Sequence, residues 1–117
     1  MALEQHSNAQ LRFDQQASNA RLDVLPFVAQ TMPLTAGCRV LEIGTAEGGV
    51  LLPFAERGAD CVGVDLDERR IELGRELHAA HRPAGSIELR CQNVYDAAFV
   101  AEFTHAFDLI ILKDAIE

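Results

Sequence analysis

The 117-residue sequence has no long apolar stretch and no excess of basic residues. No stretch approaches the roughly 20 apolar residues that a membrane-spanning helix needs, so we expect no membrane span. The N-terminus carries an acid and amides instead of a basic region followed by an apolar stretch, so we expect no secretory signal. The net charge of −8 argues against nucleic acid as a partner, because binding phosphates requires a basic surface.

Cysteine is scarce and widely spaced. The three cysteines, Cys38, Cys61 and Cys91, form no CxxC pair. Such spacing indicates neither a disulfide framework nor a zinc site. We therefore expect reduced, buried thiols in a cytoplasmic protein that has no metal site.

The first 34 residues contain no glycine and carry apolar side chains at helical spacing. This pattern predicts two short helices or one kinked helix. Pro26 is expected to interrupt or kink the segment, and Pro33 with Gly37 to end it. We divide the chain into a helical cover at 1–34 and a second unit at 35–117.

Beyond residue 37, short apolar stretches alternate with helical patterns. This alternation predicts an α/β fold, a Rossmann-like parallel sheet that is doubly wound with helices on both faces. A helix beginning near Gly48 places Pro53 close to its first turn, where proline is tolerated. The expected strands lie at 38–43, 60–65, 86–91 and 107–112, and the later helices at 67–81 and 96–105.

The helix expected at 67–81 has several residues with readable roles. Asp67 is a plausible N-cap, and Gly74 would permit close packing of the helix on the sheet. His78 and His81 are three residues apart. A shared metal ion is one interpretation of this pair, but we expect two cations that interact favourably with the helix dipole.

Ligands of a doubly wound sheet bind beyond the carboxyl ends of its strands. After the first expected strand, Gly44, Ala46 and Gly48 leave little side-chain bulk, so a ligand can approach the backbone closely. Glu42 ends that buried strand and needs a partner there. The partner is either a cationic or hydrogen-bond-donating ligand, or the amides of a tight turn.

The second and third expected strands also end in polar residues. Asp65 follows Gly44 by 21 residues, the spacing at which a carboxylate meets ribose hydroxyls in nucleotide-binding units. Its alternative role is the helix N-cap, which Asp67 fills more naturally. Asn93 offers donors and an acceptor to an adenine edge, although a loop asparagine is also a common turn former.

Four segments, VLEIGTAEGG, VGVDLD, CQNVYD and FDLIILKDAIE, together resemble the first four motifs of class I S-adenosylmethionine-dependent methyltransferases. The resemblance covers roughly 35–117. It implies strands in the order 3-2-1-4, with S-adenosylmethionine as cofactor and S-adenosylhomocysteine as product. It also implies methyl transfer from the sulfonium to an acceptor that the sequence does not identify, a small molecule or another compound, and it assigns no catalytic residue.

The same resemblance assigns roles to individual residues. Glu42 and Lys113 would lie at the methionine end of the cofactor, and Asp65 would hold the ribose hydroxyls. Ala46 stands where the family usually has its middle glycine. Adenine would be surrounded by Leu66, Asn93 and Val94. The complete set implied by the resemblance is Glu42, Gly44, Thr45, Ala46, Gly48, Asp65, Leu66, Asn93, Val94 and Lys113.

Other interpretations stay open at this point. Gly44, Ala46 and Gly49 can be aligned with a dehydrogenase fingerprint, although Glu42 would then lie near an anionic pyrophosphate. The family's complete sheet resembles seven strands, so we expect a truncated chain or a covering partner for the exposed fourth strand, with self-association through that edge as one outcome. A cofactor-binding or assembly module without turnover is the alternative to an enzyme.

Overall fold

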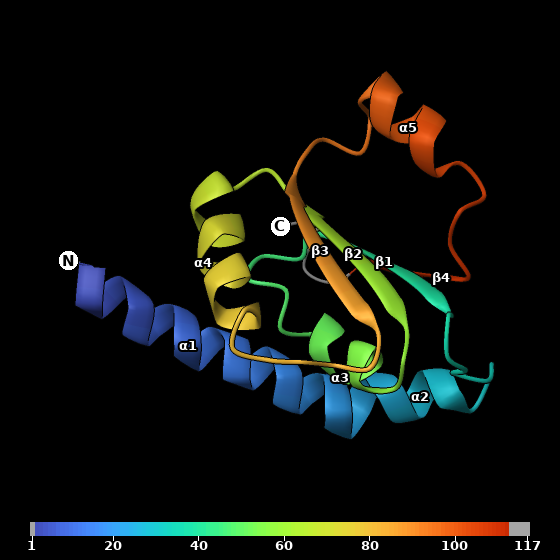
Figure 1. Ribbon diagram of the computed structural model, residues 1–117, viewed down its shortest axis with the longest axis horizontal. Helices are drawn as coiled ribbons and strands as arrows, with labels where there is room; N and C mark the ends of the chain where they lie inside the picture. The colour runs from blue at the N-terminus through green and yellow to red at the C-terminus, as the bar shows by residue number, and fades with distance from the viewer. Residues whose placement is uncertain (1, 113–117) are drawn as a thin grey trace.

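The computed structural model of this chain describes residues 2–112, and their side chains from residue 7 onward. Helices precede the first strand and then alternate with strands (Figure 1). The elements in chain order are α1 (Ala2–Asn19), a π-helical turn (Ala20–Val24), α2 (Leu25–Ala29), β1 (Arg39–Ile43), α3 (Leu51–Glu56), β2 (Asp60–Asp65), α4 (Glu68–His78), β3 (Ser86–Cys91), α5 (Ala97–Phe103) and β4 (Leu109–Leu112).

The four strands form one parallel sheet in the order β3-β2-β1-β4. This confirms the expected fold class and strand order. Ile43 at the end of β1 is paired with Val64 of β2 and with Leu112 of β4. The carboxyl ends of these three strands therefore meet at one edge of the sheet, where the candidate residues of the sequence are concentrated.

Helices cover the two faces of the sheet unequally (Figure 1). On one face α3 and α4 pack against β2 and β3, and α1 lies across the outer side of both helices. On the other face α5 reaches the sheet through Phe99, which packs with Leu41, Val62 and Val64. Alternation along the strands separates these cores, because neighbouring residues such as Val40 and Leu41 point to opposite faces.

In the N-terminal segment a π-helical turn joins α1 to α2, so the segment is helical from Ala2 to Ala29, close to the second of the two alternatives that the sequence predicts. The amide of Leu25 donates to the carbonyl of Ala20, five residues earlier, which widens the turn just before Pro26. A proline ring clashes with the carbonyl four residues before it, and it cannot donate a backbone hydrogen bond. The widened turn relieves this clash and lets the helical segment continue through the proline.

Several expected boundaries differ from the structure, and those of α4 and β4 have a visible cause. The helix α4 ends at His78 and not at residue 81, because the amides of Ala80 and His81 bond to carbonyls only three residues back. The side chain of Arg82 donates to the carbonyl of Ala79. The strand β4 begins at Leu109, and Phe107 instead stacks on Phe103 with ring centroids 5.3 Å apart.

The expectation of three buried thiols is wrong for one of them. Cys38 and Cys61 are buried, and burial raises the pKa of the Cys61 thiol to about 12. Cys91 is exposed at the end of β3, where its Sγ lies 3.5 Å from the carbonyl oxygen of Leu66. Cys91 is the last residue of its strand, and no helix in the described part of the chain covers its side chain there. The periodicity of the sequence does not show where that cover ends.

Among the described strands, β4 forms one edge of the sheet and β3 forms the other. Ile110 and Leu112 are more than half exposed on β4. Self-association through the β4 edge therefore stays a prediction. Between residues 2 and 112 no helix is both long and apolar enough to cross a membrane.

Candidate functional site

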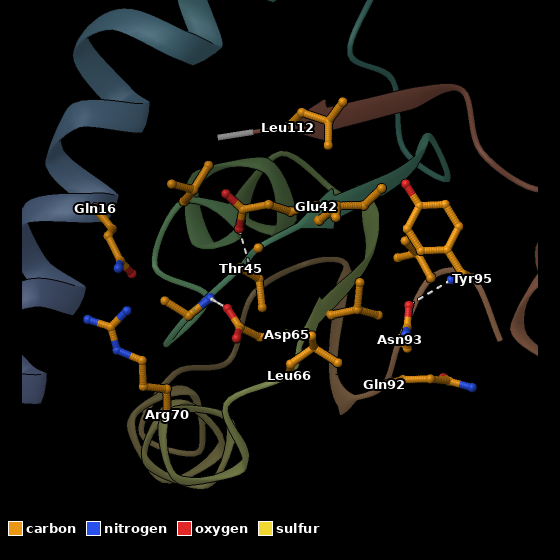
Figure 2. Close-up of a pocket in the computed structure, with 16 residues that line it drawn as sticks. Gln16, Glu42, Thr45, Asp65, Leu66, Arg70, Gln92, Asn93, Tyr95 and Leu112 are labelled. Carbon is orange, nitrogen blue, oxygen red and sulfur yellow. Dashed lines mark hydrogen bonds between the residues drawn. The ribbon is translucent and has the colours of Figure 1, made fainter. Parts of the chain in front are cut away.

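A cavity of about 980 Å³ opens at the carboxyl ends of the strands (Figure 2). Its volume is in the range of small-molecule sites in proteins. Residues from β1, β2 and β4, from the loop after β1 and from the loop after β3 line it, and α1 and α4 add one residue each. The lining residues predicted from the sequence are Glu42, Gly44, Thr45, Ala46, Asp65, Leu66, Asn93 and Val94.

The loop from 44 to 49, which we call the glycine loop, joins β1 to α3 with an unusual backbone. Gly44 has a φ of 75° and Ala46 a φ of 53°. The left-handed region is favourable for glycine but costs a residue with a Cβ about 1 kcal/mol. The resemblance to a family marks Ala46 as a departure from glycine, and its positive φ shows why glycine suits this position.

Asp65 ends β2 and is held by two backbone amides. Its Oδ2 accepts from the Ala46 amide at 2.8 Å, and its Oδ1 accepts from the Asp67 amide at 2.9 Å. A carboxylate has about four acceptor positions, so two stay available towards the cavity. The N-cap of α4 is Asp67, which accepts from the Arg70 amide, as the sequence predicts. Asp65 is thus fixed in direction and able to accept from a ligand (Figure 2).

A second carboxylate lies on the neighbouring strand. Glu42 is only 2% exposed, and the Thr45 hydroxyl donates to its Oε1 at 2.5 Å. This partner comes from the turn, but it is a hydroxyl and not one of the amides that the sequence analysis considered. Glu42 also lines the cavity, so a ligand partner stays a prediction. A buried carboxylate favours cationic or hydrogen-bond-donating ligand groups and disfavours anionic ones.

The part of the cavity wall that follows β2 and β3 combines apolar and polar side chains. Leu66 is 72% exposed there, and Val94 lines the same part of the wall. The Oδ1 of Asn93 accepts from the Tyr95 amide at 2.9 Å, so Asn93 is a turn former and presents its amide nitrogen as a donor (Figure 2). Tyr95 also lines the cavity, and the sequence analysis did not single it out. This surface fits a planar ring with an acceptor at its edge.

One assigned residue that the structure describes, Gly48, is not among the residues that line the cavity. Gly48 has a φ of 80°, and a Cβ built on it would lie 2.8 Å from Leu89 and 3.1 Å from His78. It faces the protein interior, so the structure gives it a packing role behind the loop. Lys113 lies outside the described residues.

The sequence analysis missed a group of charged and polar contacts behind the loop. Glu47 is fully buried, and its Oε2 lies 2.8 Å from Nη2 of Arg12 and 3.3 Å from Nε of Arg70. Gln16 donates to the other carboxylate oxygen of Glu47 at 3.3 Å and accepts from the Gly49 amide at 2.9 Å. Gln16 and Arg70 also line the cavity. No local pattern could have found them, because α1 and α4 bring them from distant positions.

His78 is not the exposed cation that the sequence suggested. Its Nε2 lies 2.9 Å from the Gly48 carbonyl oxygen, and its ring meets the Phe13 ring edge-on at 4.8 Å. A carbonyl oxygen only accepts, so Nε2 carries a proton, and the low pKa of His78 leaves the ring neutral at pH 7. Burial is the main cause that lowers the pKa of His78 to about 4. His81, the other member of the pair, stacks on the Phe13 ring with the ring centroids 5.8 Å apart.

This lowered pKa predicts a specific acid sensitivity. The pKa of His78 is below its unfolded value of 6.5, so its contribution to stability is complete above pH 6.5 and is lost as the pH falls towards 4. The full difference amounts to roughly 3 kcal/mol. Urea denaturation at pH 7.5 and pH 5.0 should show a larger loss of unfolding free energy for the wild type than for H78Q. Equal losses of unfolding free energy in the two proteins would contradict the lowered pKa of His78.

Comparisons with known proteins agree with this geometry. A family model described as Methyltransferase domain matches residues 40–117. A ubiquinone biosynthesis O-methyltransferase of Nitrobacter winogradskyi is 34% identical over 91 residues, which cover 76% of this chain and 32% of that protein. This chain spans about a third of the length of the curated relatives it matches.

Solved structures give the same result. PKMT2 from Rickettsia typhi in complex with AdoHcy superposes with a TM-score of 0.57 at 32% identity, over 69% of this chain and 15% of that one. Magnesium protoporphyrin IX methyltransferase from Synechocystis with bound SAH superposes with a TM-score of 0.62 at 20% identity, over 86% of this chain and 42% of that one. The second similarity concerns the fold alone.

Proposed function

The chain belongs to the methyltransferase-domain family, and on that premise we propose that its cavity binds S-adenosylmethionine for transfer of the methyl group to an acceptor. One observation carries the proposal. Two carboxylates, Glu42 and Asp65, end neighbouring parallel strands and line the same cavity on the two sides of the glycine loop.

The residues present fit this cofactor. Asp65 is anchored by two amides and keeps acceptor positions for a pair of ribose hydroxyls. Glu42 places negative charge where an ammonium or sulfonium group is stabilised. Leu66 and Val94 offer apolar surface to adenine, and the Asn93 amide nitrogen offers a donor to its edge. Charge and shape thus match a cationic nucleoside.

The protein's part in the reaction is binding and alignment. S-adenosylmethionine carries its methyl group on a positively charged sulfonium, which already activates it for transfer. The chain's residues hold the nucleoside in one orientation and keep water from its buried end, which favours an in-line approach of the acceptor. None of the described side chains is assigned as a general base.

A dinucleotide fits the cavity poorly. The pyrophosphate of a nicotinamide cofactor lies against a glycine loop of this kind. Here that loop borders Glu42, a buried carboxylate that repels an anionic group. The dehydrogenase interpretation is therefore not part of the proposal.

The acceptor and the cellular setting are proposed only in outline. The names of the curated relatives, ubiquinone biosynthesis O-methyltransferases, favour an oxygen atom of a small molecule as acceptor. The acidic net charge argues against a nucleic acid. The three free cysteines support a cytoplasmic location.

Titration calorimetry of the 117-residue chain with S-adenosylhomocysteine tests the cofactor assignment. We expect saturable one-to-one binding, because the residues that would hold the nucleoside lie within the described part of the chain. NADH serves as the control ligand, and we expect it to bind far more weakly. Failure of a folded chain to bind S-adenosylhomocysteine, or tighter binding of NADH, would contradict the proposal. Binding without methyl transfer in an acceptor screen would favour the module without turnover.

A further inference from the structure

Three residues on α4 contact the glycine loop from behind. Arg70, Gly74 and His78 are spaced four residues apart, so they lie along one stripe of the helix. Each contacts either Glu47 or Gly48 of the loop. The part of the loop that faces away from the cavity therefore packs against this stripe, and we call the stripe the seat of the loop.

Each member of the stripe makes a different contact. The Nε of Arg70 lies 3.3 Å from the buried Glu47 carboxylate. Gly74 leaves space for the Glu47 carbonyl, since a Cβ built on Gly74 would lie 2.3 Å from that oxygen. His78 donates from Nε2 to the Gly48 carbonyl at 2.9 Å. Charge, space and one directed hydrogen bond thus fix two successive peptide units.

The seated peptides are connected to the residues that line the cavity. The Gly48 amide donates to the Thr45 carbonyl at 2.8 Å, which closes the turn between them. The next residue, Ala46, presents its amide to Asp65. A shift of the Gly48 carbonyl therefore moves the turn that carries Thr45 and the amide that orients Asp65.

The surroundings of His78 exclude a direct contact between its ring and a ligand in the cavity. Its Nδ1 is buried, and among the described residues it has no hydrogen-bond partner. The Phe13 ring of α1 closes the ring in from one side. His78 is not among the residues that line the cavity, so it has no direct route to a ligand.

We propose that His78 is a positioning residue for the glycine loop, acting on the ligand site through its hydrogen bond to the Gly48 carbonyl. The proposal rests on the proposed function, because it assumes that the cavity in front of the loop binds the cofactor. It predicts that ligand affinity depends on the donor at this position and not only on the volume of the side chain.

Two substitutions separate the donor from the packing. H78L introduces an apolar side chain of similar size and removes the donor. H78Q keeps a donor, because its amide nitrogen lies about as far along the side chain as Nε2 does. V28A is the control, since Val28 is buried on α2 and packs in the core away from the loop. It lowers stability without touching the stripe.

The affinity for S-adenosylhomocysteine is measured by calorimetry on the full chain, beside thermal unfolding by circular dichroism. We expect H78L to raise Kd about fivefold, the effect of one ordinary hydrogen bond. H78Q should stay within about twofold of the wild type, and V28A should lower Tm with an unchanged Kd. The proposal is overturned if H78L binds like the wild type, if H78Q binds as weakly as H78L, or if V28A weakens binding equally.

A measurement without ligand keeps the two proposals separable. Amide hydrogen exchange reports on the Gly48 amide and on the Leu51 amide, which donates to the Gly48 carbonyl. We expect faster exchange at both amides in H78L and near-wild-type exchange in H78Q. Failure of the wild type to bind S-adenosylhomocysteine would contradict the proposed function, and the exchange rates would still support or overturn the positioning role.

Discussion

Replacing Asp65 by alanine is expected to weaken binding of S-adenosylhomocysteine about a hundredfold, the effect of losing two charge-assisted hydrogen bonds to a ligand. The carboxylate is fixed by the amides of Ala46 and Asp67, so its free acceptor positions are already oriented towards the cavity. A preoriented group loses little conformational entropy on binding, which is why its removal costs so much affinity.

Asp67 supplies a matched control two residues further along. D67A removes the same charge and the N-cap of α4, at a cost of about 1 kcal/mol in stability. We expect its Kd for S-adenosylhomocysteine to stay within about threefold of the wild type, because Asp67 does not line the cavity. Calorimetry on both variants, with circular dichroism to confirm folding, decides the matter. Equal affinities for D65A and D67A would contradict the ribose assignment.

Replacing Gly74 by alanine is expected to lower the free energy of unfolding by about 3 kcal/mol, although alanine in a helix interior usually stabilises by about 1 kcal/mol. The sign reverses because the new Cβ would lie 2.3 Å from the Glu47 carbonyl oxygen and 2.8 Å from the carbon bonded to it. Backbone atoms cannot turn aside as a flexible side chain does, so α4 and the glycine loop must separate.

Gly37 provides the comparison for this substitution. Its φ of 84° strains any residue with a Cβ, but no atom lies within 4 Å of the position that the Cβ would take. G37A should therefore cost only about 1 kcal/mol. Urea denaturation of both variants gives the two free energies. A G74A protein as stable as the wild type would show that α4 does not seat the loop as closely as the contact implies.

The alternation of strands and helices could be predicted from the sequence because the signals are local. Buried strands such as β1 are short apolar stretches. The side chain of Asp67 caps the first turn of α4, which marks the start of that helix. Parallel strands with right-handed crossovers then leave few arrangements for the sheet. The same logic placed Glu42, Asp65 and Asn93 at one edge of the sheet, because parallel strands end there. The complete set of ligand residues came from the resemblance to a family.

The tertiary structure decided what depends on how distant elements pack. Glu47 and Arg12 are 35 residues apart, and only the path of α1 across α3 and α4 brings them together. His78 is neutral because Phe13 and the glycine loop enclose it, whereas its position near a helix end indicated a cation. Local patterns establish which elements form and where their chemistry lies. Burial, charge state and the seat behind the loop arise from contacts between residues far apart in the chain, and these contacts leave no local pattern in the sequence.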